Sequence, residues 1–261
     1  MRRSSRFAVA AVIVVGFVGA SCGSDSTSVA TAAPTAVSGD IVVFAASSLT
    51  EAFTEIGAAF NIDNRDANVT FNFAGSGDLV TQIGQGAPAD IFAAADDSNM
   101  TRLIHAGESA GEPVSIAKNT MEIIVEKGNP KAITGVTDLA EPDLIVVLCA
   151  ETVPCGKSAA AVLKNAGVTT APKSLEDKVK GVVTKVIAGE ADAGIVYVSD
   201  VAAAGDAAGG VEIPADINVT NGYQMVVTKE ATNIDGAQAF IDFVASAAGQ
   251  AILAKYGFLA P

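Results

Sequence analysis

The sequence is poor in the residues that most often bind metals and nucleic acids. It contains three cysteines and a single histidine, His105, without a Cys/His cluster, so the spacing of a structural zinc site is absent. Acidic residues outnumber basic residues by 29 to 16, and no basic cluster interrupts this balance. We therefore expect neither a resident metal or cofactor nor a nucleic-acid partner.

The amino end also lacks an apolar run long enough to span a bilayer. Residues 7–20 are uncharged and mostly apolar, which falls short of the roughly 20 residues that a membrane-crossing helix needs. Arg2, Arg3 and Arg6 precede this run, and small residues follow it, as in a signal peptide. We predict that residues 1–21 are a cleaved signal peptide, whose loss changes the formal net charge from −13 to −16.

The exit of the signal peptide reads Gly-Ala-Ser-Cys, and a cysteine directly after small residues is typical of a lipoprotein. We predict a lipid on Cys22, which would anchor the protein to the outer face of the cell membrane. Gly19 stands where such signals usually carry a larger aliphatic residue, so cleavage without lipidation is the alternative. Residues 22–39, rich in Ser, Thr and Ala, are expected to form a lipid-anchored flexible tether.

The rest of the chain alternates β-branched runs with helical patterns, which predicts an α/β fold with mainly parallel sheets. We expect strands at residues 41–44, 69–74, 91–94, 121–125, 144–149, 194–198 and 223–228. Helices are expected at residues 49–61, 78–86, 98–106, 157–165, 174–188 and 234–255. The alternation restarts near residue 121, so we predict two lobes: residues 40–120 with 225–261, and residues 121–224.

Two strands lead through hydroxyl residues directly into helices. In residues 41–53, Ser48 and Glu51 have the spacing of a capping box, in which the Ser48 hydroxyl would cap the helix. The alternative is that the helix start binds an anion, because it has free N–H groups and a partial positive charge. Ser76 repeats the arrangement between Gly75 and Gly77, which either form a turn or permit a close backbone approach.

Two features of the predicted second lobe have both a structural and a functional interpretation. Tyr197 lies in an apolar strand, where a tyrosine usually packs its ring and bonds its hydroxyl locally. Cys149 and Cys155 flank the short segment Ala-Glu-Thr-Val-Pro and are either a disulfide, as an extracytoplasmic setting permits, or two separate thiols.

In their order along the chain, these segments resemble the molybdate-binding proteins of ABC importers, which are two-lobed solute-binding proteins. The resemblance runs from IVVFAASSLTEAF through FAGSGDLVTQIGQGAPADIFAAAD, VPCGKSA and GEADAGIVYVSD to the closing KYGF. It implies a periplasmic-binding-protein fold that is not an enzyme and binds molybdate or tungstate between its lobes. It also implies a monomer that delivers its ligand to an ABC permease, with molybdenum present only as the bound oxyanion.

Carried over position by position, the resemblance implies hydroxyl and backbone N–H contacts to the oxyanion from Ser48, Ser76, Cys155, Val179 and Tyr197. Molybdate, tungstate and sulfate are fully deprotonated dianions at neutral pH, so a site for them should offer only donors. Phosphate is still partly protonated and would favour an acceptor, for which Asp78 is the nearest candidate in the sequence. Sulfate or another tetrahedral oxyanion is the close alternative, since the sequence does not give the ligand radius.

Two alternatives come from other functional classes. A secreted serine hydrolase would use Ser76 or Ser48 as nucleophile and His105 as base. However, Ala74 and Phe73 precede Gly75, so the first glycine of a G-x-S-x-G motif is missing. A lipid-anchored adhesion or sensor protein would use the tether but gives no reason for the repeated strand-to-hydroxyl turns.

Overall fold

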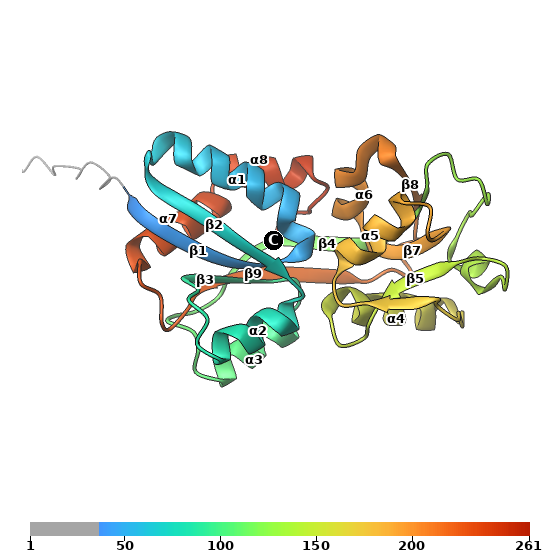
Figure 1. The fold of residues 1–261 in the computed structure, drawn as a ribbon, viewed down its shortest axis with the longest axis horizontal. Coiled ribbons are helices and arrows are strands. Elements are labelled where there is room, and N and C mark those ends of the chain that lie inside the picture. The colour runs from blue at the N-terminus through green and yellow to red at the C-terminus, as the bar shows by residue number, and fades with distance from the viewer. Residues whose placement is uncertain (1–36) are drawn as a thin grey trace, which may run out of the picture. The chain divides into compact units, whose positions relative to one another are not determined.

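The computed structural model describes residues 37–261, and within them the predicted α/β fold class is confirmed (Figure 1). The predicted signal peptide, Cys22 and most of the predicted tether lie outside the described residues. No single helix within residues 37–261 is long and apolar enough to cross a membrane, although the helices Ile234–Ala245 (α7) and Ala247–Lys255 (α8) together, bent by 61°, reach that length and composition.

The elements follow one another as strand and helix over most of the chain. The first part contains β1 (Ser38–Ala46), η1 (Ser47–Leu49), α1 (Thr50–Asp63), β2 (Asp66–Ala74), α2 (Ser76–Gly84), β3 (Ile91–Ala94) and α3 (Asp97–His105). The middle part contains β4 (Val114–Glu126), η2 (Val136–Ala140), β5 (Val146–Cys149), α4 (Pro154–Ala166), β6 (Ser174–Glu176), α5 (Val179–Ile187), β7 (Ala193–Tyr197), α6 (Val198–Ala204), η3 (Gly205–Ala207) and β8 (Ala208–Glu212). The last part contains β9 (Thr220–Val227), α7 (Ile234–Ala245) and α8 (Ala247–Lys255).

The strands form a nine-stranded sheet in the order β2-β1-β3-β9-β4-β7-β5-β6, with β8 beside β4. The neighbours β1 and β2, β1 and β3, β5 and β6, and β5 and β7 are parallel. Strands β4 and β9 run antiparallel to the strands that they pair with, so they join two parallel regions into one mixed sheet.

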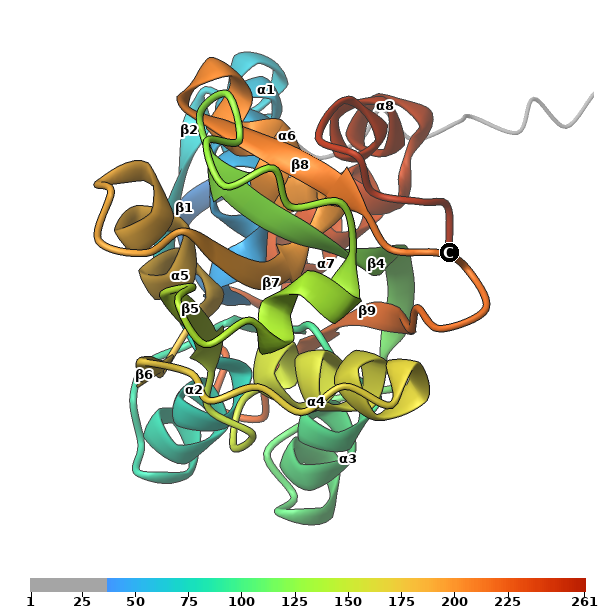
Figure 2. The same ribbon diagram turned by 90° about the vertical axis from the view of Figure 1, so that its right-hand side faces the viewer.

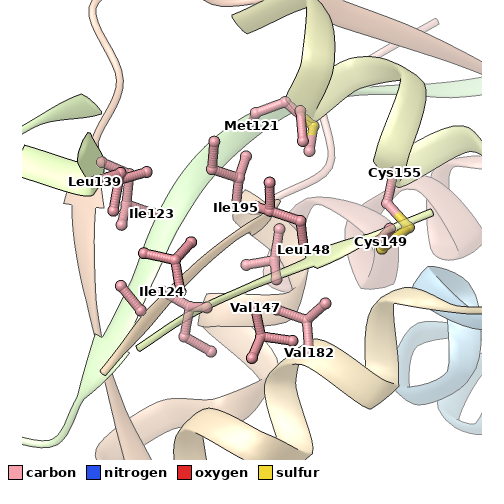
Figure 3. Packing of buried hydrophobic residues seen from close by; sticks show 14 of the residues in the cluster. Met121, Ile123, Ile124, Leu139, Val147, Leu148, Cys149, Cys155, Val182 and Ile195 are labelled. Carbon is pink, nitrogen blue, oxygen red and sulfur yellow. A yellow bond between two sulfur atoms is a disulfide. The ribbon is translucent and has the colours of Figure 1, made fainter. Parts of the chain in front are cut away.

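Buried apolar residues form three clusters, two on the opposite faces of the first parallel region, together called the first core, and one at the second region. The first core, from residues 41–117 and 223–258, has α1, α7 and α8 on one face of the sheet and α2 and α3 on the other (Figure 1). The second core lies within residues 121–213, with α5 and α6 on one side of β5 and β7 and α4 on the other (Figures 1 and 2). In Figure 3, side chains of β4, β5, β7 and α5 meet in the second core.

The predicted lobe boundaries remain a prediction, and the two cores follow them except at Tyr223, which lies in the predicted range 121–224 but packs in the first core. Strand β4 passes from one core to the other, because Ile116 packs in the first core and Ile123 in the second. Strand β9 pairs with β3 in the first core and with the first half of β4. Tyr223 on β9 packs in the first core, and its ring meets that of Tyr197 of the second core at 5.9 Å.

Some predicted elements were wrong in extent. Residues 174–176 form strand β6, paired with β5, rather than the first turn of a helix, so α5 begins only at Val179. Residues 234–255 form two helices, because Ser246 leaves helical geometry and its hydroxyl accepts the N–H of Gly249 to cap α8. Strand β4 begins at Val114, well before the predicted residue 121, and α6 and β8 were not predicted.

The first core depends on an aromatic cluster around Phe240, which is fully buried on α7. Its ring meets those of Phe60 at 5.3 Å and Phe53 at 6.2 Å in edge-on geometry. We predict that Phe240→Ala lowers the free energy of unfolding by about 3–5 kcal/mol, because it removes these contacts and leaves a cavity. Urea denaturation would measure this loss, and Ile62→Ala, whose side chain is 70% exposed, should change stability by less than about 0.5 kcal/mol. Equal losses in both variants would contradict the assignment.

Candidate functional site

All five residues predicted to contact an oxyanion line one cavity. The lining residues are Ala46, Ser47, Ser48, Ala74, Gly75, Ser76, Ala95, Val153, Pro154, Cys155, Lys178, Val179 and Tyr197. The cavity contains about 210 Å³ of space that protein atoms do not fill, part of it open to solvent. Residues from both cores contribute to it, so the site is complete only when the two cores are together.

The register of the parallel strands explains why these distant residues meet. Ala46 at the end of β1 lies beside Ala74 at the end of β2, so Ser48 and Ser76 emerge from the same edge of the sheet. In the second core, the end of β5 lies beside the end of β6, which brings the starts of α4 and α5 together. Ligands of open α/β sheets bind at the carboxyl ends of strands for this reason.

The starts of three helices therefore surround the cavity. Ser76 is the first residue of α2, Cys155 is the second of α4, and Val179 is the first of α5. The first N–H groups of a helix have no acceptor within it and carry partial positive charge. Pro154, the first residue of α4, has no N–H and favours the helical backbone, so Cys155 offers the first amide of that helix. These amides can bind an anion without any positively charged side chain.

Both serine hydroxyls are fixed by neighbours. The N–H of Ala95 donates to Ser76 Oγ at 3.2 Å, so the Ser76 proton remains available to another acceptor. Ser48 Oγ lies 2.9 Å from the hydroxyl of Tyr223, a fully buried residue. When Tyr223 donates in this bond, the Ser48 proton is also free to point at a ligand.

Tyr197 supplies an unpartnered polar group. Only 1% of the residue is exposed, and its hydroxyl has no hydrogen-bond partner among residues 37–261. Burial raises the pKa of Tyr197 well above its ordinary value, so the hydroxyl is neutral and can donate at physiological pH. A buried hydroxyl without a partner is costly, and a ligand acceptor in the cavity would remove that cost.

Gly75 permits the two sides of the cavity to approach each other. A Cβ atom at this position would lie 2.8 Å from the carbonyl oxygen of Asp177 and 3.1 Å from a methyl group of Val153. Both neighbours belong to the chain segment that carries the second core, so a larger residue would push the walls apart. A glycine is therefore needed at this position because the two walls of the cavity approach each other closely here.

A disulfide joins Cys149 to Cys155, with their Cα atoms 5.8 Å apart (Figure 3). It connects the end of β5 to the helix start that offers the Cys155 amide. The enclosed loop is tight, because a Cβ atom on Gly156 would lie 1.9 Å from the carbonyl oxygen of Ala150. The bridge therefore limits how far the Cys155 N–H can move from the cavity.

A charged network behind Tyr197 was not predicted from the sequence. Asp200 is fully buried on α6 and accepts the N–H of Tyr197 at 3.2 Å. Lys180 Nζ lies 3.0 Å from Asp200 Oδ1 and 2.6 Å from Glu51 Oε2. The position of Asp200, three residues after Tyr197 at the start of a helix, was a local signal from which its bond to Tyr197 could have been predicted. The sequence around Lys180 gives no such signal for its pairing with Asp200.

The predicted capping box at Ser48 and Glu51 was wrong. Neither η1 nor α1 has a side-chain cap, since Ser48 bonds Tyr223 and Glu51 bonds Lys180. The hydrolase alternative also lacks its base, because His105 is exposed at the end of α3 and does not line the cavity. Of the two interpretations of the Ser48 segment, the anion site fits these contacts.

The network makes stability depend on pH in a defined direction. Burial raises the pKa of Asp200 to about 6, and Lys180 only partly opposes this shift. For Lys180 itself, burial would lower the pKa, but Asp200 and Glu51 outweigh burial and raise it, so Lys180 stays charged and Asp200 is the group that titrates.

Because the folded pKa of Asp200 exceeds the unfolded value, the native state holds this proton more tightly, and stability falls as pH rises from about 4 to about 6. We predict that the stability of the wild type relative to Asp200→Asn falls by about 2 kcal/mol across this window. Chemical denaturation of both proteins at the two ends of the window would measure the difference. A constant difference would contradict the raised pKa.

Comparisons with known proteins find relatives over most of the chain. The molybdate-binding protein ModA of Mycobacterium tuberculosis is 44% identical over 253 residues, which cover 97% of this chain and 96% of that protein. The solved substrate-binding domain of a putative molybdenum ABC transporter from Clostridium difficile has a TM-score of 0.65 at 30% identity and covers 85% of this chain and 99% of that chain. The periplasmic molybdate-binding protein of Azotobacter vinelandii, at 20% identity, has the same fold with a TM-score of 0.74, again covering 85% and 99%.

The family model described as bacterial extracellular solute-binding protein matches residues 41–259. This range includes both cores and every residue that lines the cavity. Such proteins bind ligands rather than catalyse reactions. The chain belongs to the family of bacterial extracellular solute-binding proteins.

Proposed function

We propose that this protein captures molybdate, and also tungstate, outside the cytoplasm and delivers it to an ABC permease. The observation that carries the proposal is a cavity with hydroxyl and amide donors on both sides and no carboxylate among its described lining residues. The molybdate-binding relatives support the choice of ligand.

The donor set matches the charge state of the ligand. A fully deprotonated tetrahedral dianion has only acceptors, and Ser48, Ser76, Cys155, Val179 and Tyr197 would each direct a proton toward it. Hydrogen bonds to an ionised acceptor are roughly twice as strong as neutral ones, so several of them can replace water around the ligand.

A partly protonated ligand such as phosphate fits this cavity less well. It would need an acceptor, and Asp78 is exposed on α2 and does not line the cavity. The charged residue that does line it is Lys178, at the N-cap of α5, which also favours an anion.

Binding would couple to movement of the two predicted lobes, residues 40–120 with 225–261 and residues 121–224. Donors come from both cores, so the ligand interacts with all of them only when the cores are together. A ligand shifts such an equilibrium by its difference in affinity for the two forms, and the permease would then recognise the ligand-bound form of a monomer.

We also propose that a lipid on Cys22 anchors the protein to the outer face of the cell membrane through the tether. Mass spectrometry of protein from the membrane fraction should find the diacylglycerol mass on a peptide that begins at Cys22. Cys22→Ser should release the protein into the medium or periplasm. An unmodified amino terminus near Cys22 on wild-type protein would contradict lipidation and favour cleavage at a neighbouring site.

The choice of ligand is tested by thermal shift of residues 37–261 with molybdate, tungstate, sulfate and phosphate. A ligand that binds only the native state raises its stability by an amount that grows with ligand concentration over Kd. We predict a large shift with molybdate and tungstate and a smaller one with sulfate and phosphate. A sulfate shift equal to or above that of molybdate would assign the protein to sulfate instead.

The donor assignment is tested by isothermal titration calorimetry with molybdate. Ser48→Ala, Ser76→Ala and Tyr197→Phe should each weaken binding by about 1–3 kcal/mol, because each leaves one ligand oxygen without a donor. Thr101→Ala, an exposed hydroxyl on α3, is the matched control and should bind as the wild type does. Unchanged affinity in all three site variants would refute the assignment.

A further inference from the structure

Two lysines of the second core reach acids of the first core on either side of the proposed ligand site. Lys180 Nζ lies 2.6 Å from Glu51 Oε2, and Lys157 Nζ lies 3.0 Å from Asp96 Oδ2. Lys157 also bonds Ser98 Oγ at 2.7 Å, so this contact involves more than one group of the first core.

Both lysines belong to the helix turns that offer the proposed amide donors. Lys157 lies two residues after Cys155 in the first turn of α4, and Lys180 follows Val179 in the first turn of α5. A lysine is unfavourable at this end of a helix, because its charge has the same sign as the helix terminus. Helix stability therefore does not explain these positions, and a contact outside the helix does.

Neither α4 nor α5 carries an acid in its own first turn. The acids that pair with the two lysines belong to the first core instead. Glu51 lies in the first turn of α1, and Asp96 is the N-cap of α3, where its side chain also accepts the N–H of Asn99. Both acids thus occupy helix positions that suit a negative charge. The acids remain outside the cavity lining and leave the ligand site free of carboxylates.

The other ion pairs of residues 37–261 do not join the two cores. Lys255 and Glu55 pair at 2.6 Å within the first core, while Lys185 and Glu176 pair at 2.6 Å beside the second. The pairs of Lys131 with Asp192 and of Lys229 with Glu230 are also local to one core.

We propose that the Lys180–Glu51 and Lys157–Asp96 pairs are two latches that stabilise the ligand-bound arrangement of the cores without touching the ligand. The proposal rests on the oxyanion-binding function given above. Each latch holds the start of one donor helix against the first core, so that the Cys155 and Val179 amides stay on the ligand. The four residues are positioning residues, and their loss should act mainly on ligand dissociation.

Glu51→Gln is a test in which the latch and a purely electrostatic effect predict opposite changes in ligand affinity. Removing a negative charge near an anion site should strengthen binding if only the general electrostatic field matters. Removing a latch should weaken binding, although the ligand contacts are unchanged. The variant also leaves the Lys180–Asp200 pair in place, so the buried Asp200 keeps its counter-charge.

The chain offers a matched control on the same helix. Glu55 lies one turn after Glu51 on α1 and pairs with Lys255 at the same distance of 2.6 Å, but within one core. Glu55→Gln therefore removes the same charge and a similar ion pair without removing a latch. For Lys157→Met, the control is Lys164→Met, in the last turn of the same helix.

The experiment is titration calorimetry and stopped-flow dissociation with molybdate on residues 37–261, with melting of each unliganded variant as a check of folding. We expect Glu51→Gln and Lys157→Met each to weaken binding about 3- to 10-fold, mainly through faster dissociation, with less than 2-fold change in the controls. Raising salt from about 0.05 to about 0.5 M should weaken wild-type binding more than binding to the double variant, because exposed ion pairs are screened. Asp96→Asn, which retains a good helix cap, should reproduce Lys157→Met.

The outcomes separate the two proposals. If the wild type binds molybdate and Glu51→Gln binds as tightly as Glu55→Gln or more tightly, the latch proposal is overturned and the ligand assignment stands. If the wild type binds no oxyanion, the proposed function itself fails. A variant that melts at a lower temperature but keeps wild-type affinity and dissociation rate has lost only a structural contact, which also overturns the latch.

Discussion

The main constraint on this fold is that it brings hydrogen-bond donors without partners together at one edge of the sheet. A buried donor that has no acceptor costs free energy, and here Tyr197 contributes such a hydroxyl beside the first amides of α4 and α5. Parallel strand pairing places these donors together, because each strand end leads directly to a helix start. An anion would satisfy all of them at once, so the unfavourable groups of the free protein become the contacts of the bound one.

The acidic character of the chain is compatible with an anion site because the repulsion from surface charges acts at long range and is screened, whereas hydrogen bonds in the cavity act at short range. A formal net charge of −13 for the full sequence repels anions at a distance, but salt screens exposed charges over about 10 Å. Inside the cavity, short hydrogen bonds from fixed donors to the proposed oxyanion would outweigh this screened repulsion. Glu51 and Asp96 are paired with lysines in the first turns of α5 and α4, so their charges are compensated locally.

Local patterns predicted much of the fold and of the candidate site, and long-range pairing accounts for the rest. Strand β3 has the predicted bounds, and Ser48 and Ser76 lie at strand-to-helix turns as expected, since such turns depend on neighbouring residues. The order of segments, through the family resemblance, predicted that Cys155, Val179 and Tyr197 belong to the candidate site. The capping box was wrong because Glu51 bonds a lysine 129 positions away, and the start of the helix at 174 was wrong because β5 pairs with those residues. Neither partner can be read from a local window.

In the proposed mechanism, donors from both cores converge on one deprotonated oxyanion. Anomalous diffraction at the molybdenum edge, from crystals grown with molybdate, tests it most directly. We expect one strong peak in the cavity, with ligand oxygens at about 2.7–3.2 Å from the hydroxyls of Ser48, Ser76 and Tyr197 and from the N–H groups of Cys155 and Val179. A peak elsewhere on the protein, or a carboxylate among the contacts of the ligand, would contradict it.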